Sequence, residues 1–249
     1  MINLIYALIF AVLMNVLIFI IAFIFKSDKL TDLTYSLTFI LISLFFLLYN
    51  HIALSKTILF LMILIWALRL GGYLFYRINK IKKDSRFDKI RANFFKFLFF
   101  WIFQGITAFI ILVPSMLYFN SETKLSYLSF IGIFVFLIGF LIETISDIQK
   151  FNFIINPKNK NKWIEHGLWK YSRHPNYFGE MLVWIGIYVY CINSISWIYG
   201  IISPLFLIFI LRYVSGVPML EKKNNEKFKN NKKYLEYKKK TNMFIVWPK

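Results

Sequence analysis

Long apolar runs separated by short polar segments dominate the pattern of residues along this chain. A helix that crosses a bilayer needs about 20 mostly apolar residues, because the hydrocarbon core is roughly 30 Å thick. Several runs meet that length and the others come close, which predicts an all-α, polytopic membrane bundle of about seven transmembrane helices. The predicted spans are residues 2–25, 35–49, 57–76, 97–119, 127–142, 177–192 and 195–211.

Charged residues gather in three of the segments between these runs. Lys and Arg outnumber Asp and Glu by eight to two in residues 77–96, by six to three in residues 143–177 and by eleven to three in residues 212–249. Basic loops stay in the cytoplasm under the positive-inside rule, and these segments follow the third, fifth and seventh spans. The pattern predicts an outside N-terminus and a cytoplasmic C-terminus, and it assigns the net charge of +18 to membrane topology rather than to nucleic-acid binding.

A stretch rich in Lys and Asn, residues 221–240, follows the last predicted span. It reads as a solvated basic helix or a frayed tail near anionic headgroups, where each lysine gains about 1 kcal/mol. No repeat or linker divides the chain, so we expect one integral membrane domain over residues 1–249. The host is expected to be a bacterial cytoplasmic membrane, or the endoplasmic reticulum in a eukaryote.

Polar and aromatic residues crowd together before the sixth span, in the sequence WIEHGLWKYSRHPNYFGE at residues 163–180, which we call the elbow. Pro175 suits the first turn of a helix, whose free N–H groups favour an anion such as phosphate, and Arg173 would add charge-assisted hydrogen bonds. The alternative is an interfacial anchor, in which aromatics lie among headgroups, Arg173 extends toward water and Glu180 pairs with a lysine. Spacing alone does not choose between them.

The elbow strongly resembles the signature of the steroid 5-alpha-reductase-like membrane proteins, in particular their bacterial branch. Further stretches match that branch in the same order, from about residue 28 to residue 248. They are WALRLGG at 66–72, DSRFDKIR at 84–91, FWIFQG at 100–105, SDIQK at 146–150 and SGVPMLE at 215–221.

This resemblance implies that residues 120–249 hold NADPH in a cavity open to the cytoplasm and that residues 1–119 hold a lipid substrate. Asp147 falls on the family's cofactor-contacting aspartate, Asn176 on its asparagine near the nicotinamide, and Arg212 on an arginine that faces the phosphates. Without the resemblance, Arg212 reads equally well as a cytoplasmic anchor of the seventh span. The full set of candidate cofactor residues is Asp147, Lys150, Gly167, Tyr171, Arg173, His174, Asn176, Tyr177, Glu180 and Arg212.

The activity implied by the resemblance is hydride transfer from NADPH to an activated alkene in a steroid-like or other lipid enone, with a hydrogen-bond donor on the carbonyl. The family's donors are a glutamate on the second span and a tyrosine on the third. This chain has no glutamate in the second span and Trp66 near the tyrosine position, which weakens the case for a steroid in particular. The candidate catalytic residues are Asp32, Tyr35 and Tyr73, with Tyr76 as another possible donor and a helix cap as the other role for Asp32.

Two other functions fit parts of the sequence. Isoprenylcysteine and phospholipid methyltransferases, which use S-adenosylmethionine, share a related elbow and a basic tail. They carry a Glu-Glu pair where this chain has Glu221 and Lys222, and they lack the block at 84–105. A non-enzymatic lipid-binding protein could keep the elbow for folding alone. A metal is not expected, because His166, His174 and Glu180 do not have the spacing of a zinc helix.

Overall fold

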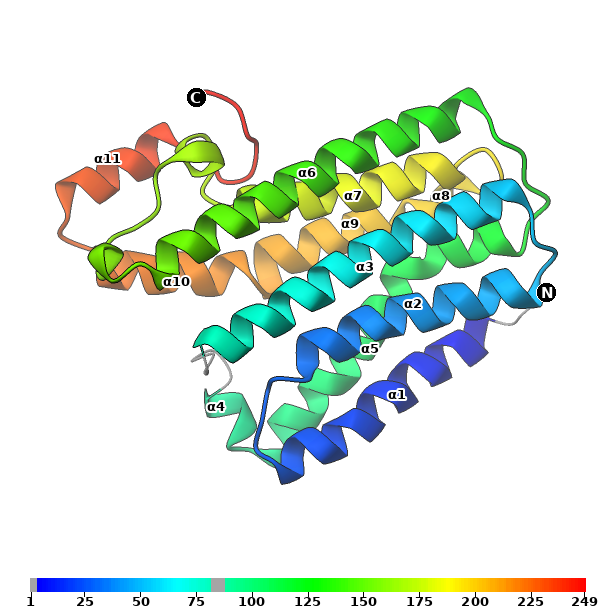
Figure 1. Ribbon diagram of the computed structural model, residues 1–249, viewed down its shortest axis with the longest axis horizontal. Coiled ribbons are helices and arrows are strands. Elements are labelled where there is room, and N and C mark those ends of the chain that lie inside the picture. The colour runs from blue at the N-terminus through cyan, green and yellow to red at the C-terminus, as the bar shows by residue number, and fades with distance from the viewer. Residues whose placement is uncertain (1–3, 82–87) are drawn as a thin grey trace. The chain divides into compact units, whose positions relative to one another are not determined.

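The computed structural model describes residues 4–81 and 88–249, and its regular structure is helical throughout those residues (Figure 1). The first helices are α1 (Leu4–Ile24), α2 (Thr31–Tyr49), α3 (Leu54–Ile81), α4 (Asp88–Arg91) and α5 (Phe94–Phe119). After them come α6 (Tyr127–Ile155), η1 (Pro157–Asn159), η2 (Gly167–Lys170), α7 (Pro175–Cys191), α8 (Trp197–Gly200), α9 (Ile202–Phe209), η3 (Ile210–Val214), α10 (Val217–Lys227) and α11 (Lys232–Lys240). The prediction of an all-α fold is confirmed, while residues 84–87 of the matching stretch at 84–91 lie outside the described residues.

Among the described segments, six are long and apolar enough to cross a membrane, and they make this an integral membrane protein. They are α1, α2, α3, α5, α6 and the helical stretch Trp197–Lys227. The 17 residues of α7 lie at the short end of what can span. Together these elements agree with the predicted bundle of about seven.

Two helix ends differ from the sequence prediction. The fifth predicted span stops at residue 142, where the apolar run ends, but α6 continues to Ile155. It continues because its charged residues do not interrupt the backbone hydrogen bonds, and two of them, Glu143 and Asp147, are buried. The α-helix of the seventh predicted span changes to a π-helical turn at η3. The chain then bends at Gly216, whose φ is 62°.

The chain divides into two compact units. The first comprises Met1–Ser129 and Tyr190–Ser203, and the second comprises Phe130–Val189 and Pro204–Lys249. The candidate catalytic residues belong to the first unit, and all the candidate cofactor residues belong to the second.

A buried polar network joins three helices of the first unit. Asn15 on α1 donates to Thr38 Oγ1 on α2 over 3.1 Å, and Gln104 on α5 donates to Asn15 Oδ1 over 2.8 Å. The backbones of α1 and α5 approach closely here, because a Cβ atom on Gly105 would lie 2.8 Å from the carbonyl oxygen of Ala11. In a bilayer the hydrophobic effect does not drive helices together, because lipid tails are as apolar as the helix surfaces. Hydrogen bonds of this kind are among the interactions that hold such helices together instead. Gln104 therefore bonds across helices, from α5 to α1.

Glycines join α6 to α7 in the second unit, where the two helices run side by side (Figure 1). A Cβ atom on Gly179 would lie 2.5 Å from the backbone nitrogen of Glu143. At Gly186 the same atom would lie 2.5 Å from the backbone nitrogen of Phe136. Small residues at such a contact let two backbones touch. This packing fixes the start of α7, and with it the elbow, against α6.

Candidate functional site

The first half of the elbow is bonded to α6. Gly167 has a φ of 60°, and a Cβ atom there would lie 2.3 Å from the side-chain nitrogen of Gln149. The carbonyl oxygen of that Gln149 amide accepts from the backbone N–H of Leu168 over 3.1 Å. Trp169 donates its indole N–H to the carbonyl oxygen of Ser146 over 3.1 Å. The positive φ of Gly167 therefore favours glycine, and a Cβ atom there would displace the Gln149 amide that bonds to Leu168.

The second half of the elbow is bonded to a segment near the C-terminus, residues 241–244, which we call the strap. Ser172 and Asn242 form a parallel bridge, the sole β-type pairing among the described residues. Three backbone hydrogen bonds hold the strap in place: Arg173 N–H to Asn242 O at 2.9 Å, His174 N–H to Met243 O at 3.1 Å, and Asn242 N–H to Tyr171 O at 3.2 Å. The N–H groups of Arg173 and His174, which precede Pro175, thus donate to the strap.

Glu221, on α10, is the ionic centre of this region. Its Oε1 atom accepts from Arg173 Nε and His174 Nε2, each at 3.0 Å, and its Oε2 atom lies 3.4 Å from Lys238 Nζ. Arg173 also donates through Nη1 to the carbonyl oxygens of Thr241, at 2.7 Å, and Lys238, at 3.1 Å. Glu221 entered the sequence analysis as the last residue of a matching stretch and as a departure from a Glu-Glu pair, and this role was missed. No local signal identified it, since its partner Arg173 is 48 residues away.

His174 is buried, with 3% of its surface exposed. Burial lowers its pKa below the ordinary histidine value, although the hydrogen bond to Glu221 acts in the opposite direction. Histidine is then neutral near pH 7, and since the Glu221 carboxylate is an acceptor, we assign the ring proton to Nε2. The other ring nitrogen, Nδ1, becomes an acceptor, and it is buried without a hydrogen-bond partner among the described residues.

Asn176, two residues later and in the first turn of α7, presents a second such atom. Its Oδ1 is also buried and has no hydrogen-bond partner in the part of the chain that the structure describes. Unpaired buried acceptors are uncommon, because each loses its hydrogen bonds to water without replacement. Each of the two atoms has the capacity to accept a further hydrogen bond.

Two cationic candidates lie against aromatic rings. The Nζ atom of Lys150 is 4.8 Å from the ring centre of Trp169, and its charge acts on His174. Arg212 is exposed and donates through Nε to the hydroxyl of Tyr213 over 2.9 Å. Its guanidinium lies 5.9 Å from the ring centre of Phe244, in the strap. Arg212 is thus both an aromatic-stacked anchor and an accessible positive charge beside the strap.

Of the remaining candidates of the second unit, Tyr177 contacts His174 directly. Tyr177 stacks on His174 with ring centres 5.8 Å apart, and Tyr171 is partly exposed. Asp147 is buried one helical turn after Glu143 on α6, and Glu180 is partly buried on α7. The structure therefore places His174, Tyr177, Arg173 and the strap in direct contact.

The interpretation of Asp32 as a helix cap is wrong. Helix α2 begins at Thr31, so that Asp32 is its second residue, and the cap position belongs to Leu30, which makes no side-chain cap bond. The Thr31 hydroxyl donates instead to the carbonyl oxygen of Asp28 over 2.7 Å. A carboxylate in the first turn still interacts favourably with the helix dipole.

The two tyrosine candidates flank a close crossing of α2 and α3. A Cβ atom on Gly71 would lie 2.7 Å from the hydroxyl oxygen of Ser36, the residue after Tyr35. The Tyr35 ring meets Phe39 edge-on at 4.9 Å. Tyr73, two residues after Gly71, is partly buried. The structure thus brings the two tyrosine positions to one crossing, whereas Tyr76 is more exposed and lies near Lys80.

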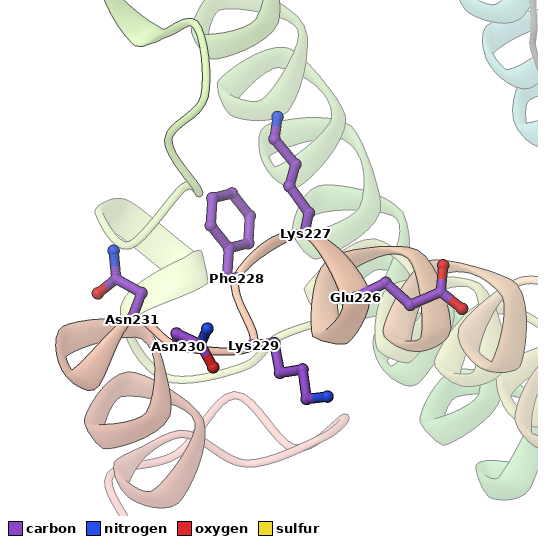
Figure 2. A pocket seen from close by; sticks show the side chains of 6 residues that line it. All are labelled: Glu226, Lys227, Phe228, Lys229, Asn230 and Asn231. Atoms are coloured by element: carbon purple, nitrogen blue, oxygen red, sulfur yellow. The ribbon is translucent and has the colours of Figure 1, made fainter.

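A surface hollow at the turn between α10 and α11 contains none of the candidate residues. Figure 2 shows the side chains that line it, which are Glu226, Lys227, Phe228, Lys229, Asn230 and Asn231.

Within residues 4–81 and 88–249, no three His, Cys, Asp or Glu side chains are grouped as metal ligands would be.

Comparison with known proteins places the chain at the level of a family. Neither a curated protein nor a solved structure matches it. One family, described as "Protein of unknown function (DUF1295)", matches residues 18–241, which is most of the chain. The chain belongs to this DUF1295 family of membrane proteins.

Proposed function

We propose that this protein is a membrane-embedded, NADPH-dependent reductase of a carbon–carbon double bond in a lipid enone, steroid-like or otherwise, similar to the steroid 5-alpha-reductases. The observation that carries the proposal is the pair of buried, unpaired acceptors at the elbow, His174 Nδ1 and Asn176 Oδ1. A bacterial cytoplasmic membrane is the proposed location, with the elbow on the cytoplasmic side, where NADPH is available.

The residues of the elbow fit the chemical groups of NADPH. The carboxamide and ribose hydroxyls of the nicotinamide end are hydrogen-bond donors, which suit the acceptors on His174 and Asn176. The phosphates are anions, which suit the cations Lys150 and Arg212. Arg173 would play a different part, because its Nε and Nη1 atoms already hold Glu221 and the strap. It would position the pocket rather than receive a phosphate.

When bound, NADPH supplies the hydride. The chain's contribution is to bind the cofactor, to exclude water and to place a hydrogen-bond donor on the substrate carbonyl as negative charge develops there. Tyr35 and Tyr73 have hydroxyl groups suited to that task, and a protonated Asp32 would serve as well. The positions of Tyr35 and Tyr73 near the crossing of α2 and α3 support the choice of these two residues.

Methyl transfer from S-adenosylmethionine is the second candidate. Glu221 favours it, because those enzymes also carry glutamate after the last span, and here that residue contacts the elbow. The ammonium group of S-adenosylmethionine is a donor that the two unpaired acceptors would suit equally well. A lipid-binding role without catalysis is the third candidate, supported by the many bonds that the elbow already makes within the protein.

One titration separates the three functions. Purified protein in detergent is heated with increasing NADPH, NADH or S-adenosylmethionine, and the unfolding temperature is followed by intrinsic fluorescence. A ligand at 100 times its dissociation constant stabilises the folded state by about 2.7 kcal/mol. Stabilisation by NADPH supports the reductase, stabilisation by S-adenosylmethionine alone rejects it, and no stabilisation by any of the three leaves the lipid-binding role. Oxidation of NADPH by vesicles that contain an enone lipid then tests the reaction itself.

A further inference from the structure

Helix α11 has two faces of different character. One face is bonded to the elbow region: Tyr234 is buried, Tyr237 donates to the carbonyl oxygen of Trp169 over 2.8 Å, and Lys238 reaches Glu221. The other positions are exposed, and most of them are basic. The exposed residues are Lys232, Lys233, Leu235, Glu236, Lys239 and Lys240.

The basic surface extends to the turn between α10 and α11. Lys227 and Lys229 are exposed there, and in Figure 2 their side chains extend away from each other rather than converging on the hollow. A pocket for one phosphate would need its cations to converge. The arrangement suits an extended anionic surface instead.

Large apolar side chains are exposed on α11 and in the segment that follows the strap. Leu235 is 43% exposed, Ile245 is 58% exposed and Trp247 is 70% exposed. The Asn242 amide of the strap donates to the carbonyl oxygen of Trp247 over 2.7 Å, which holds the end of the chain near the strap. Lysines mixed with Trp and Leu are typical of segments that lie in the headgroup region of a bilayer. A soluble polyanion such as RNA offers no apolar phase for Ile245.

We propose that the exposed face of α11, together with Ile245 and Trp247, docks on anionic phospholipid headgroups of the bilayer that this chain spans. The lysines pair with headgroup phosphates, and the two apolar side chains enter the boundary with the acyl chains. This docking is independent of the proposed reductase activity, since it requires neither cofactor nor substrate.

The docked helix also holds the elbow in place. The inner face of α11 bonds to Trp169 and Glu221, and the strap starts directly after it at Thr241. An anionic bilayer that immobilises α11 therefore immobilises the strap and the backbone of Arg173 and His174, to which the strap is bonded. Anionic lipid becomes a stabilising ligand of the candidate cofactor site.

The test uses the full chain in nanodiscs of phosphatidylcholine, with and without phosphatidylglycerol. Hydrogen exchange is measured by mass spectrometry on peptides from residues 228–249. The variant Lys232→Gln/Lys233→Gln/Lys239→Gln removes three exposed charges from α11. The matched control, Lys158→Gln/Lys160→Gln/Lys162→Gln, removes three exposed charges around η1.

We expect phosphatidylglycerol to slow exchange in the wild type and in the control, but not in the α11 variant. Each surface lysine contributes about fivefold to partitioning onto an anionic bilayer, so exchange in the variant should be faster by roughly tenfold or more. A second readout is fluorescence quenching by brominated acyl chains, which should be weaker in Trp247→Phe than in the wild type. That variant keeps every lysine and remains informative if the triple variant does not fold.

Three results would overturn the proposal. The first is equal exchange in both lipid mixtures. The second is an equal loss of protection in the control variant, which would mean that net charge alone is responsible. The third is full protection by soluble polyphosphate or RNA in phosphatidylcholine discs, which would identify a polyanion rather than a bilayer as the partner.

Discussion

The Oε1 atom of Glu221 lies 3.0 Å from the Nε atom of Arg173, and this ion pair joins α10 to the elbow that precedes α7. Both side chains are mostly buried, and Arg173 uses its Nη1 atom to hold the backbone at the start of the strap. Removing one partner of a buried ion pair is strongly destabilising, because the other charge is left buried without compensation. The geometry of the elbow therefore depends on a carboxylate that belongs to a different helix.

Replacing Glu221 with Gln should destabilise the protein by on the order of 2 kcal/mol, because Arg173 and Lys238 would lose their anionic partner. The change is measured as a lower unfolding temperature in detergent and as faster hydrogen exchange in residues 238–249. Glu236→Gln is the matched control, since it makes the same change at an exposed position of α11. Equal unfolding temperatures for the two variants would show that the ion pair is not structural.

Gly179→Ala should destabilise the second unit by about 1–3 kcal/mol, because the new methyl group would collide with the backbone of α6 at Glu143. The collision is with backbone rather than with a flexible side chain, so local adjustment is limited. Gly72→Ala on α3 is the control: a Cβ atom there meets nothing within 4 Å, and alanine favours the helix. The measurement is the unfolding temperature of both variants. Equal unfolding temperatures for Gly179→Ala and Gly72→Ala would contradict the close contact between α6 and α7.

Folding stability should fall as the pH drops below about 6.5, the ordinary pKa of histidine. Burial lowers the pKa of His174 in the folded state, so the unfolded chain takes up a proton that the folded chain resists. The contribution is fully present above the unfolded pKa and is lost as the pH falls toward the folded value. Unfolding temperatures of the wild type and of His174→Gln, measured from pH 7.5 to pH 5, should differ in slope, with the variant flatter.

The exposed His166 provides the control for this pH series. His166→Gln makes the same substitution at an exposed position and is measured over the same pH range. A wild-type slope in His174→Gln would mean that other groups cause the loss of stability in acid.

Asn176→Ala should weaken NADPH binding about tenfold while leaving the unfolding temperature of the free protein nearly unchanged. The reason is that Asn176 Oδ1 accepts no hydrogen bond within the protein, so its removal breaks none at that atom. A hydrogen bond to a ligand contributes about 1 kcal/mol or more. The measurement is the NADPH titration proposed above, with the exposed Asn152→Ala as its control. Unchanged affinity in Asn176→Ala would remove this residue from the candidate site.

The sequence was most informative where a property is local. A long apolar run can satisfy its backbone groups in lipid only as a helix, so the membrane fold followed directly from the runs. Helix ends were less predictable: α6 extends 13 residues beyond the predicted end at residue 142, because buried polar side chains do not stop a helix. The start of α7 at Pro175 agrees with the expectation, since the proline ring is compatible with a first turn.

The candidate site shows the same division. The motif identified His174 and Asn176 as candidates, but only the tertiary structure revealed that Nδ1 of one and Oδ1 of the other are buried and unpaired. The role of Glu221 and the strap was inaccessible to sequence reasoning. Their contacts with the elbow join positions from 47 to 71 residues apart, and no spacing rule operates over such distances.

By itself, the sequence determined that this chain is an all-helical membrane protein with its polar chemistry concentrated before the sixth predicted span. Hydropathy and turn residues act over a few neighbouring positions, so their effects can be predicted from the sequence. The tertiary structure decided which of those polar groups are used within the protein and which lie unpaired at the elbow. That outcome depends on which distant segments pack together, because burial and hydrogen-bond partners are properties of the folded chain.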